Sequence, residues 1–156
     1  MVKKKSPYEH KRYWYHVSTT LKKKQVCITP RDEDECMNRD WREPSGKRIC
    51  VSPTIEQCIT AIPYILGATC SIYKTKNRLI AHKPHDVFDS KITQEGWLHR
   101  PTFFVKIGTL NFKDIEVGLG VENVIEQAAS LDEPRRSGKV LRWWKRARIN
   151  RFIKKT

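Results

Sequence analysis

The sequence predicts an α+β fold, in which a strand-rich core is followed by a basic helical extension. Short runs of aromatic and β-branched residues occur along the first two thirds of the chain, and apolar residues with helical spacing follow towards its end. The 156 residues allow one domain rather than two, and the 38% hydrophobic residues are sufficient for its core. We therefore expect a single core that needs no disulfide cross-links.

The core is predicted to contain several strands of an antiparallel-leaning sheet. Strands are expected at residues 12–18, 25–28, 48–51, 70–73, 79–82 and 97–112. In the first of them, Tyr13 and Val17 share one face while Trp14 and His16 share the other, because side chains alternate along a strand. A long polar loop is expected at residues 32–46.

A helix is predicted directly after the strand at residues 48–51. Ser52 is the expected N-cap and Pro53 the first helical residue, since a serine oxygen accepts an orphan N–H and proline loses nothing there. Apolar residues then recur at helical spacing over residues 55–62.

The C-terminal region is predicted to form a basic α-hairpin. A first helix is expected over residues 121–131, ended by Pro134, and Ser137 is the expected cap of a second helix that runs to Phe152. We thus expect a flexible basic arm at residues 1–11, a core at 12–117 and a helical basic extension at 118–156.

The net charge of +14 is concentrated at the two ends of the chain. Residues 1–24 contain eight Lys or Arg against one acid, and residues 135–156 contain ten with no acid. A polyanion such as nucleic acid is the partner this pattern favours, with an acidic membrane surface or a merely solubilising role as alternatives. The candidate nucleic-acid-binding residues are Lys139, Arg142, Lys145, Arg146, Arg148 and Arg151.

The five cysteines form an odd set without a Cys-x-x-Cys pair. No secretory signal or bilayer-length apolar run is recognisable, so we expect reduced thiols and a cytoplasmic protein. We expect no metal, because the only suggestive spacing is His82 and His85 around a proline.

The most informative local feature is the pair His16 and Ser18, which project from the same side of the first strand. Phosphoesterases that use two His-x-Ser/Thr motifs are excluded, because no other histidine of this chain is followed by Ser or Thr two positions later.

Three segments together resemble the ADP-ribosyltransferase fold. They are Tyr-His-Val-Ser at 15–18, the strand–helix junction Arg-Ile-Cys-Val-Ser-Pro-Thr at 48–54, and Thr-Gln-Glu-Gly-Trp at 93–97. Residues 13–115 also resemble small proteins of phages and their bacterial hosts. The resemblance implies that NAD is the co-substrate.

The resemblance assigns roles to individual residues. His16 would donate to a ribose hydroxyl of NAD, and Glu95 would steady the oxocarbenium-like ribose or activate an acceptor. Ser18 and Ser52 would line the nicotinamide side, and Arg31 or Arg48 would bind the pyrophosphate. Thr93 stands where that family has Gln or Glu two residues before the glutamate.

Each candidate also has a structural interpretation. His16 could be a hydrogen-bonded sheet residue, Ser52 a helix cap and Glu95 a turn residue, while Arg31 and Arg48 could pair with the acidic loop. The sequence therefore supports two functions. One is an NAD-using transferase that modifies a host protein or nucleic acid. The other is a non-enzymatic protein on the same fold that binds nucleic acid or blocks a nucleic-acid-bound host complex.

Overall fold

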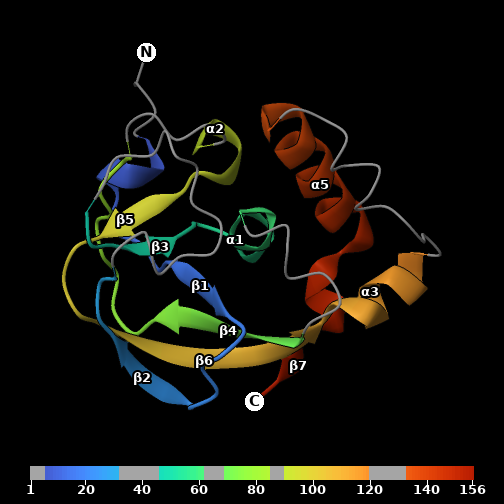
Figure 1. Ribbon diagram of the computed structural model, residues 1–156, viewed down its shortest axis with the longest axis horizontal. Coiled ribbons are helices and arrows are strands. Elements are labelled where there is room, and N and C mark those ends of the chain that lie inside the picture. The colour runs from blue at the N-terminus through green and yellow to red at the C-terminus, as the bar shows by residue number, and fades with distance from the viewer. Residues whose placement is uncertain (1–5, 32–45, 62–68, 85–89, 120–132) are drawn as a thin grey trace.

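The computed structural model describes residues 6–31, 46–61, 69–84, 90–119 and 133–156, and combines helices with antiparallel sheets (Figure 1). Within these residues, the larger sheet has the order β1–β4–β6–β2, and β7 pairs with β6. The strands of this sheet are β1 (Tyr15–Ser18), β2 (Gln25–Ile28), β4 (Thr69–Thr75), β6 (Thr102–Asn111) and β7 (Lys154–Lys155). A smaller sheet pairs β3 (Ile49–Val51) with β5 (Gly96–Leu98).

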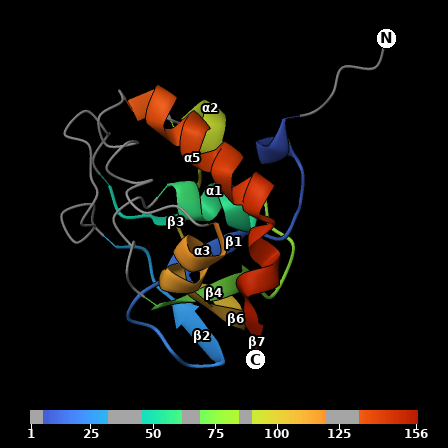
Figure 2. The ribbon, with the colours of Figure 1, turned by 90° about the vertical axis from the view of Figure 1, so that its right-hand side faces the viewer.

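The helices gather at one end of the larger sheet, where α1 and α5 lie above the strands (Figure 2). The α-helices are α1 (Ile55–Thr60), α2 (Ser90–Thr93), α3 (Phe112–Leu119) and α5 (Glu133–Ala147). The 3-10 helices are η1 (Pro7–Glu9) and η4 (Ile149–Phe152). In the described parts of the chain, no helix combines the length and apolarity needed to cross a bilayer.

The larger sheet contributes one cluster of buried residues to each of its faces. Ile72 packs with Val17 and with the helices, whereas its neighbour Tyr73 packs with Trp14 and the smaller sheet. Neighbouring residues of a strand point to opposite faces, so the helices and the smaller sheet cover opposite sides. The predicted alternation of Trp14 and His16 against Val17 is confirmed, since all three are buried on their respective faces.

The two sheets are joined by main-chain hydrogen bonds between β1 and the end of β3. Tyr15 N donates to Ser52 O over 2.9 Å, and Ser52 N donates to Tyr15 O over 3.1 Å. On the other side of β3, Cys50 pairs with Trp97 and Val51 with Gly96. The strand β3 therefore holds β1 and β5 together.

The predicted cap of the first helix is wrong. Thr54 is the N-cap of α1, and its hydroxyl accepts from Gln57 N over 3.2 Å. Ser52 is still extended because its main chain pairs with Tyr15. The pairing between the sheets thus delays the helix by two residues.

The predicted start of the last helix is also wrong. Helix α5 begins at Glu133, so Pro134 lies in its first turn, where a missing N–H costs nothing, and Ser137 is a buried interior residue. The helix predicted over residues 121–131 lies outside the described residues. Val140 and Trp144 of α5 are buried beside α1 and α3, so this part of the extension is packed onto the core.

Part of the predicted basic arm is packed as well. Tyr8 of η1 is buried, and its ring stacks on that of Trp14 with the centroids 6.2 Å apart. The strand predicted over residues 79–82 is reduced to isolated pairings of Leu79 with Arg12 and of His82 with Trp97. The run at residues 97–112 is divided between β5 and β6.

Two glycine substitutions test this packing in opposite directions. A Cβ on Gly96 would lie 2.7 Å from Ala81 Cβ and 3.2 Å from the Trp14 ring, so Gly96→Ala must displace β5 and lower the free energy of unfolding by about 1–3 kcal/mol. A Cβ on Gly138 of α5 meets nothing closer than 3.7 Å, so Gly138→Ala should raise it by about 0.5–1 kcal/mol. Urea unfolding measures both, and equal stability of the two variants would contradict this packing.

Candidate functional site

The three segments of the sequence resemblance meet around the end of β3. His16 Nδ1 lies 2.9 Å from the carbonyl oxygen of Cys50. Glu95 directly precedes Gly96, the partner of Val51, and its side chain is hydrogen-bonded to the Cys50 thiol. We call this place, defined by His16, Cys50, Ser52 and Glu95, the β3 junction.

His16 is a buried, neutral member of the β3 junction. Its side chain is 9% exposed, and its ring lies 5.7 Å from that of Phe104. A carbonyl oxygen can only accept a hydrogen bond, so Nδ1 must carry the proton and Nε2 is left as an acceptor. Burial lowers the pKa of His16 below its ordinary value of 6.5, and the nearby charge of Arg31 lowers it further, while the bond to Cys50 acts in the opposite direction.

Glu95 reaches the β3 junction from a strained turn. Gln94, at the end of α2, has a φ of 52°, the left-handed conformation that usually requires glycine. The thiol of Cys50 is hydrogen-bonded to both the Glu95 and the Arg48 side chains. Burial and the Glu95 carboxylate raise the pKa of Tyr8 to about 12. Together with burial, the Glu95 carboxylate thus raises the pKa values of both Cys50 and Tyr8.

The two arginines predicted to bind pyrophosphate differ in accessibility. Arg31 and Arg48 pair through their main chains over 2.9 and 3.1 Å. The Arg48 guanidinium lies 3.9 Å above the centre of the Trp97 ring, and the residue is only 4% exposed. Arg31 is exposed, so it is the cation of this pair that solvent and a ligand can reach.

The two serines predicted to line the nicotinamide side are placed for structural roles. Ser18 Oγ accepts from Leu21 N over 2.9 Å and from Thr20 N over 3.2 Å, which makes the turn after β1. Ser52 is 1% exposed. Of the predicted site residues in the core, His16 lies against the carbonyl oxygen of Cys50 and Glu95 against its thiol, while the main chain of Ser52 pairs with Tyr15.

The cysteines of the core are protonated thiols. Burial, aided by the charge of Glu95, raises the pKa of Cys50 well above its ordinary value of 9.0 despite the opposing effect of Arg48. Burial likewise raises the pKa of Cys58, and that of Cys70 to about 12. A thiol with a raised pKa is a poor nucleophile, so Cys50, Cys58 and Cys70 are poor candidates for nucleophilic catalysis. Among the described residues, no group of three or more His, Cys, Asp or Glu has the arrangement of a metal site.

The candidate nucleic-acid-binding residues lie on and just after α5. Arg142, Lys145, Arg146 and Arg148 are exposed. Lys139 Nζ lies 5.3 Å from the centre of the Trp143 ring. Arg151 has a structural task, because its Nη2 donates to the carbonyl oxygen of Ala147 at the end of the helix over 2.9 Å.

Two partners in the site were missed by sequence reasoning. Tyr8 was assigned to a flexible arm, and Trp97 was given no role in the site. Their positions beside Glu95 and Arg48 depend on contacts between distant segments. The aromatic Tyr8 between Pro7 and Glu9 was the one local sign that the arm could pack.

No protein-family model matches the sequence, and searches of curated proteins and of solved structures find no match either. The function must therefore be inferred from the arrangement of the residues themselves.

The pH dependence of stability tests the buried state of His16. Its folded pKa is lowered, so the unfolded chain takes up a proton at higher pH than the folded chain does. The free energy of unfolding should therefore decrease as the pH falls below 6.5, by up to about 1.4 kcal/mol per pH unit. His16→Asn retains an N–H for the Cys50 carbonyl but does not titrate, and its profile between pH 7.5 and 5 should be flatter. Parallel profiles of the two proteins would contradict this assignment.

Proposed function

We propose that this chain uses NAD to transfer ADP-ribose to an acceptor, with His16 and Glu95 as the residues that act on the ribose. The observation that carries the proposal is the meeting of three separately recognised segments at the β3 junction. An accidental likeness of three short motifs gives no reason for them to lie together. The pairing of β1 with β3 and of β3 with β5 brings them together through main-chain bonds.

The side chains at the β3 junction suit the demands of this transfer. When NAD is bound, its ribose–nicotinamide bond breaks, nicotinamide leaves with the bonding electrons, and an acceptor atom bonds to the ribose carbon and loses a proton. Positive charge develops on the ribose, and the Glu95 carboxylate would stabilise it electrostatically. His16 Nε2 would accept a hydrogen bond from a ribose hydroxyl, in contrast to the donor role expected from the sequence.

Electrostatics around the β3 junction favour an anionic ligand. Arg31 is exposed, and its charge acts on His16. The guanidinium of Arg48 is stacked on the Trp97 ring. Arg31 would make the direct charge-assisted bonds to the pyrophosphate. Arg48 would contribute its charge from the interior, because its guanidinium is already stacked on the indole.

The acceptor that we propose is a host nucleic acid or a protein bound to one. The exposed cations of α5 would attract such a target by long-range electrostatics. The free thiols of Cys27, Cys50, Cys58 and Cys70 are compatible with work in the reducing cytoplasm of a bacterial host. The resemblance to small phage proteins points to the same setting.

Labelled NAD tests the transferase activity. Incubation with bacterial lysate should transfer label from the adenylate part of NAD to macromolecules, and nuclease and protease treatment then identify the acceptor class. Glu95→Gln should lower the rate about 100-fold or more, because it removes the stabilising charge. Glu56→Gln, which neutralises an acid in the first turn of α1, should leave the rate unchanged.

Binding of NAD separates loss of chemistry from loss of folding. NAD should raise the melting temperature of the wild type and of Glu95→Gln, and Arg31→Met should reduce that increase. Absence of both label transfer and an NAD-dependent increase in melting temperature would overturn the proposal.

A second candidate function is binding of nucleic acid without turnover. The observation in its favour is the division of α5, which buries Val140, Trp144 and Ala147 while Arg142 and Arg146 are exposed. Affinity through such contacts should decrease steeply with salt, and replacing both arginines by glutamine should reduce that salt dependence for duplex and single strands alike.

A further inference from the structure

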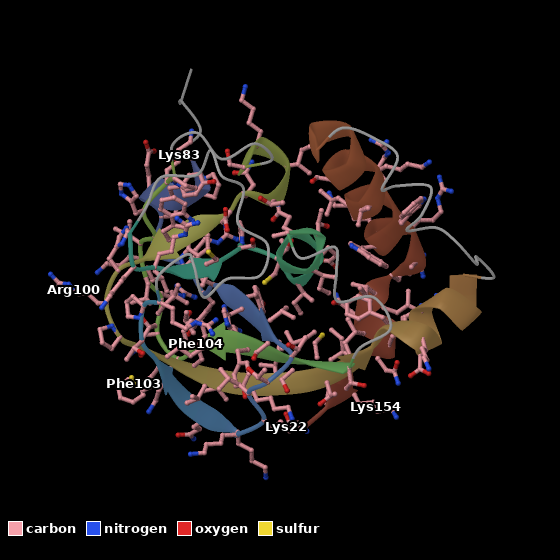
Figure 3. All side chains as sticks on the ribbon, in the orientation of Figure 1. Lys22, Lys83, Arg100, Phe103, Phe104 and Lys154 are labelled. Atoms are coloured by element: carbon pink, nitrogen blue, oxygen red, sulfur yellow. The ribbon has the colours of Figure 1, made fainter. Side chains whose placement is uncertain are left out.

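The larger sheet has an uncovered region on the face that carries Val17 and Ile72. The helices cover this face at the end of the sheet where Val17 and Ile72 lie. At the other end, Phe103 is 62% exposed although its neighbour Phe104 is almost fully buried. Figure 3 shows Phe104 in the interior between the sheets and Phe103 at the outer margin of β2 and β6. Phe103, the second residue of β6, therefore leaves an aromatic ring open to solvent at this end of the sheet.

Two further exposed side chains, Lys76 and Tyr13, lie near Phe103 on this face of the sheet. Lys76 N donates to Phe103 O over 2.9 Å, which continues the pairing of Thr75 with Phe104. The chain departs from the β1–β4 register before Tyr13, because Arg12 pairs with Leu79, but the Tyr13 ring lies over Lys74 of β4, 4.3 Å from its Nζ. Residues opposite one another across strands point to the same face. Phe103 and Lys76 are opposite one another, and Tyr13 lies beside them over Lys74; we call these four residues the aromatic row.

Basic side chains lie beside the aromatic row. The strands β1, β2, β4 and β6, as described, contain no Asp or Glu. Lys74 Nζ lies 4.3 Å and Arg78 Cζ 5.4 Å from the centre of the Tyr13 ring. Tyr13 itself is 36% exposed. The row thus combines two exposed aromatic rings with cations.

We propose that the aromatic row binds single-stranded nucleic acid, with bases stacked on Tyr13 and Phe103 and the intervening phosphates held by Lys76, Lys74 and Arg78. Unpaired bases offer the flat faces that stack on exposed aromatic rings of a sheet, and a duplex hides them. A second copy of this chain is a poorer occupant, because it would bring the same cations against one another. This proposal is independent of NAD chemistry at the β3 junction.

Anisotropy of a labelled 12-nucleotide single strand tests the proposal in the full chain. Phe103→Leu keeps an apolar side chain but removes the ring, and should weaken binding about 5- to 150-fold, the range for loss of one stacked base. Phe103→Tyr should retain the wild-type affinity. Ile80→Ala, which truncates another side chain that is 56% exposed, is the matched control and should bind as the wild type does.

Two further measurements make the result decisive. Lys76→Gln should weaken binding and reduce the salt slope by about 1, as expected for a single phosphate contact. The wild type should bind the single strand more tightly than a duplex of the same length, and Tyr13→Leu should narrow that difference. Equal binding by Phe103→Leu and wild type would overturn the proposal, as would equal affinity for duplex and single strand. A dimer in sedimentation that Phe103→Leu abolishes would instead assign the face to self-association.

Discussion

The two main-chain hydrogen bonds between Tyr15 and Ser52 are the constraint on which the arrangement of this protein depends. They join the edge of the larger sheet to β3, and β3 in turn pairs with β5. Because of this pairing, Ser52 remains extended and the helix α1 begins only after Thr54. The same pairing brings His16 against the carbonyl of Cys50, so these two long-range bonds set both the fold and the geometry of the β3 junction.

The larger sheet separates two kinds of chemistry on its two faces. The inner face holds His16 and Phe104 beside the smaller sheet, where burial keeps the histidine neutral. The opposite face is covered by helices at one end and leaves Tyr13 and Phe103 exposed at the other. In our two proposals, the inner face serves the transfer reaction and the opposite face binds single-stranded nucleic acid.

The sequence allowed the local structure to be predicted, but not the contacts between distant segments. Alternation in the first strand correctly assigned Trp14 and Val17 to opposite buried faces, because a strand's period is a local property. Ser52 was assigned as a helix cap for an equally local reason, and the prediction was wrong because its main chain pairs with Tyr15. Ser137 was misplaced because proline is as acceptable in the first turn of a helix as after its end.

The sequence indicated which residues are candidates for the site, but not which of them are exposed. The strands that carry His16, Ser52 and Glu95 are neighbours, because β3 pairs with Tyr15 on one side and with β5 on the other. The stacking of the buried Arg48 on the Trp97 ring depends on the register of β3 and β5, and no short sequence motif predicts that register. Local patterns therefore identified the polar groups of the site, whereas pairing decides which of them a ligand can reach.

The protonation state of the His16 ring nitrogens tests the central claim most directly. Long-range 1H–15N spectra of the labelled protein at pH 7.5, assigned with His16→Asn, should show Nδ1 protonated and Nε2 unprotonated, because the Cys50 carbonyl requires a donor. Addition of NAD should then shift the Nε2 resonance. A ring protonated at Nε2 instead, or an Nε2 resonance that does not respond to NAD, would contradict the account of the β3 junction.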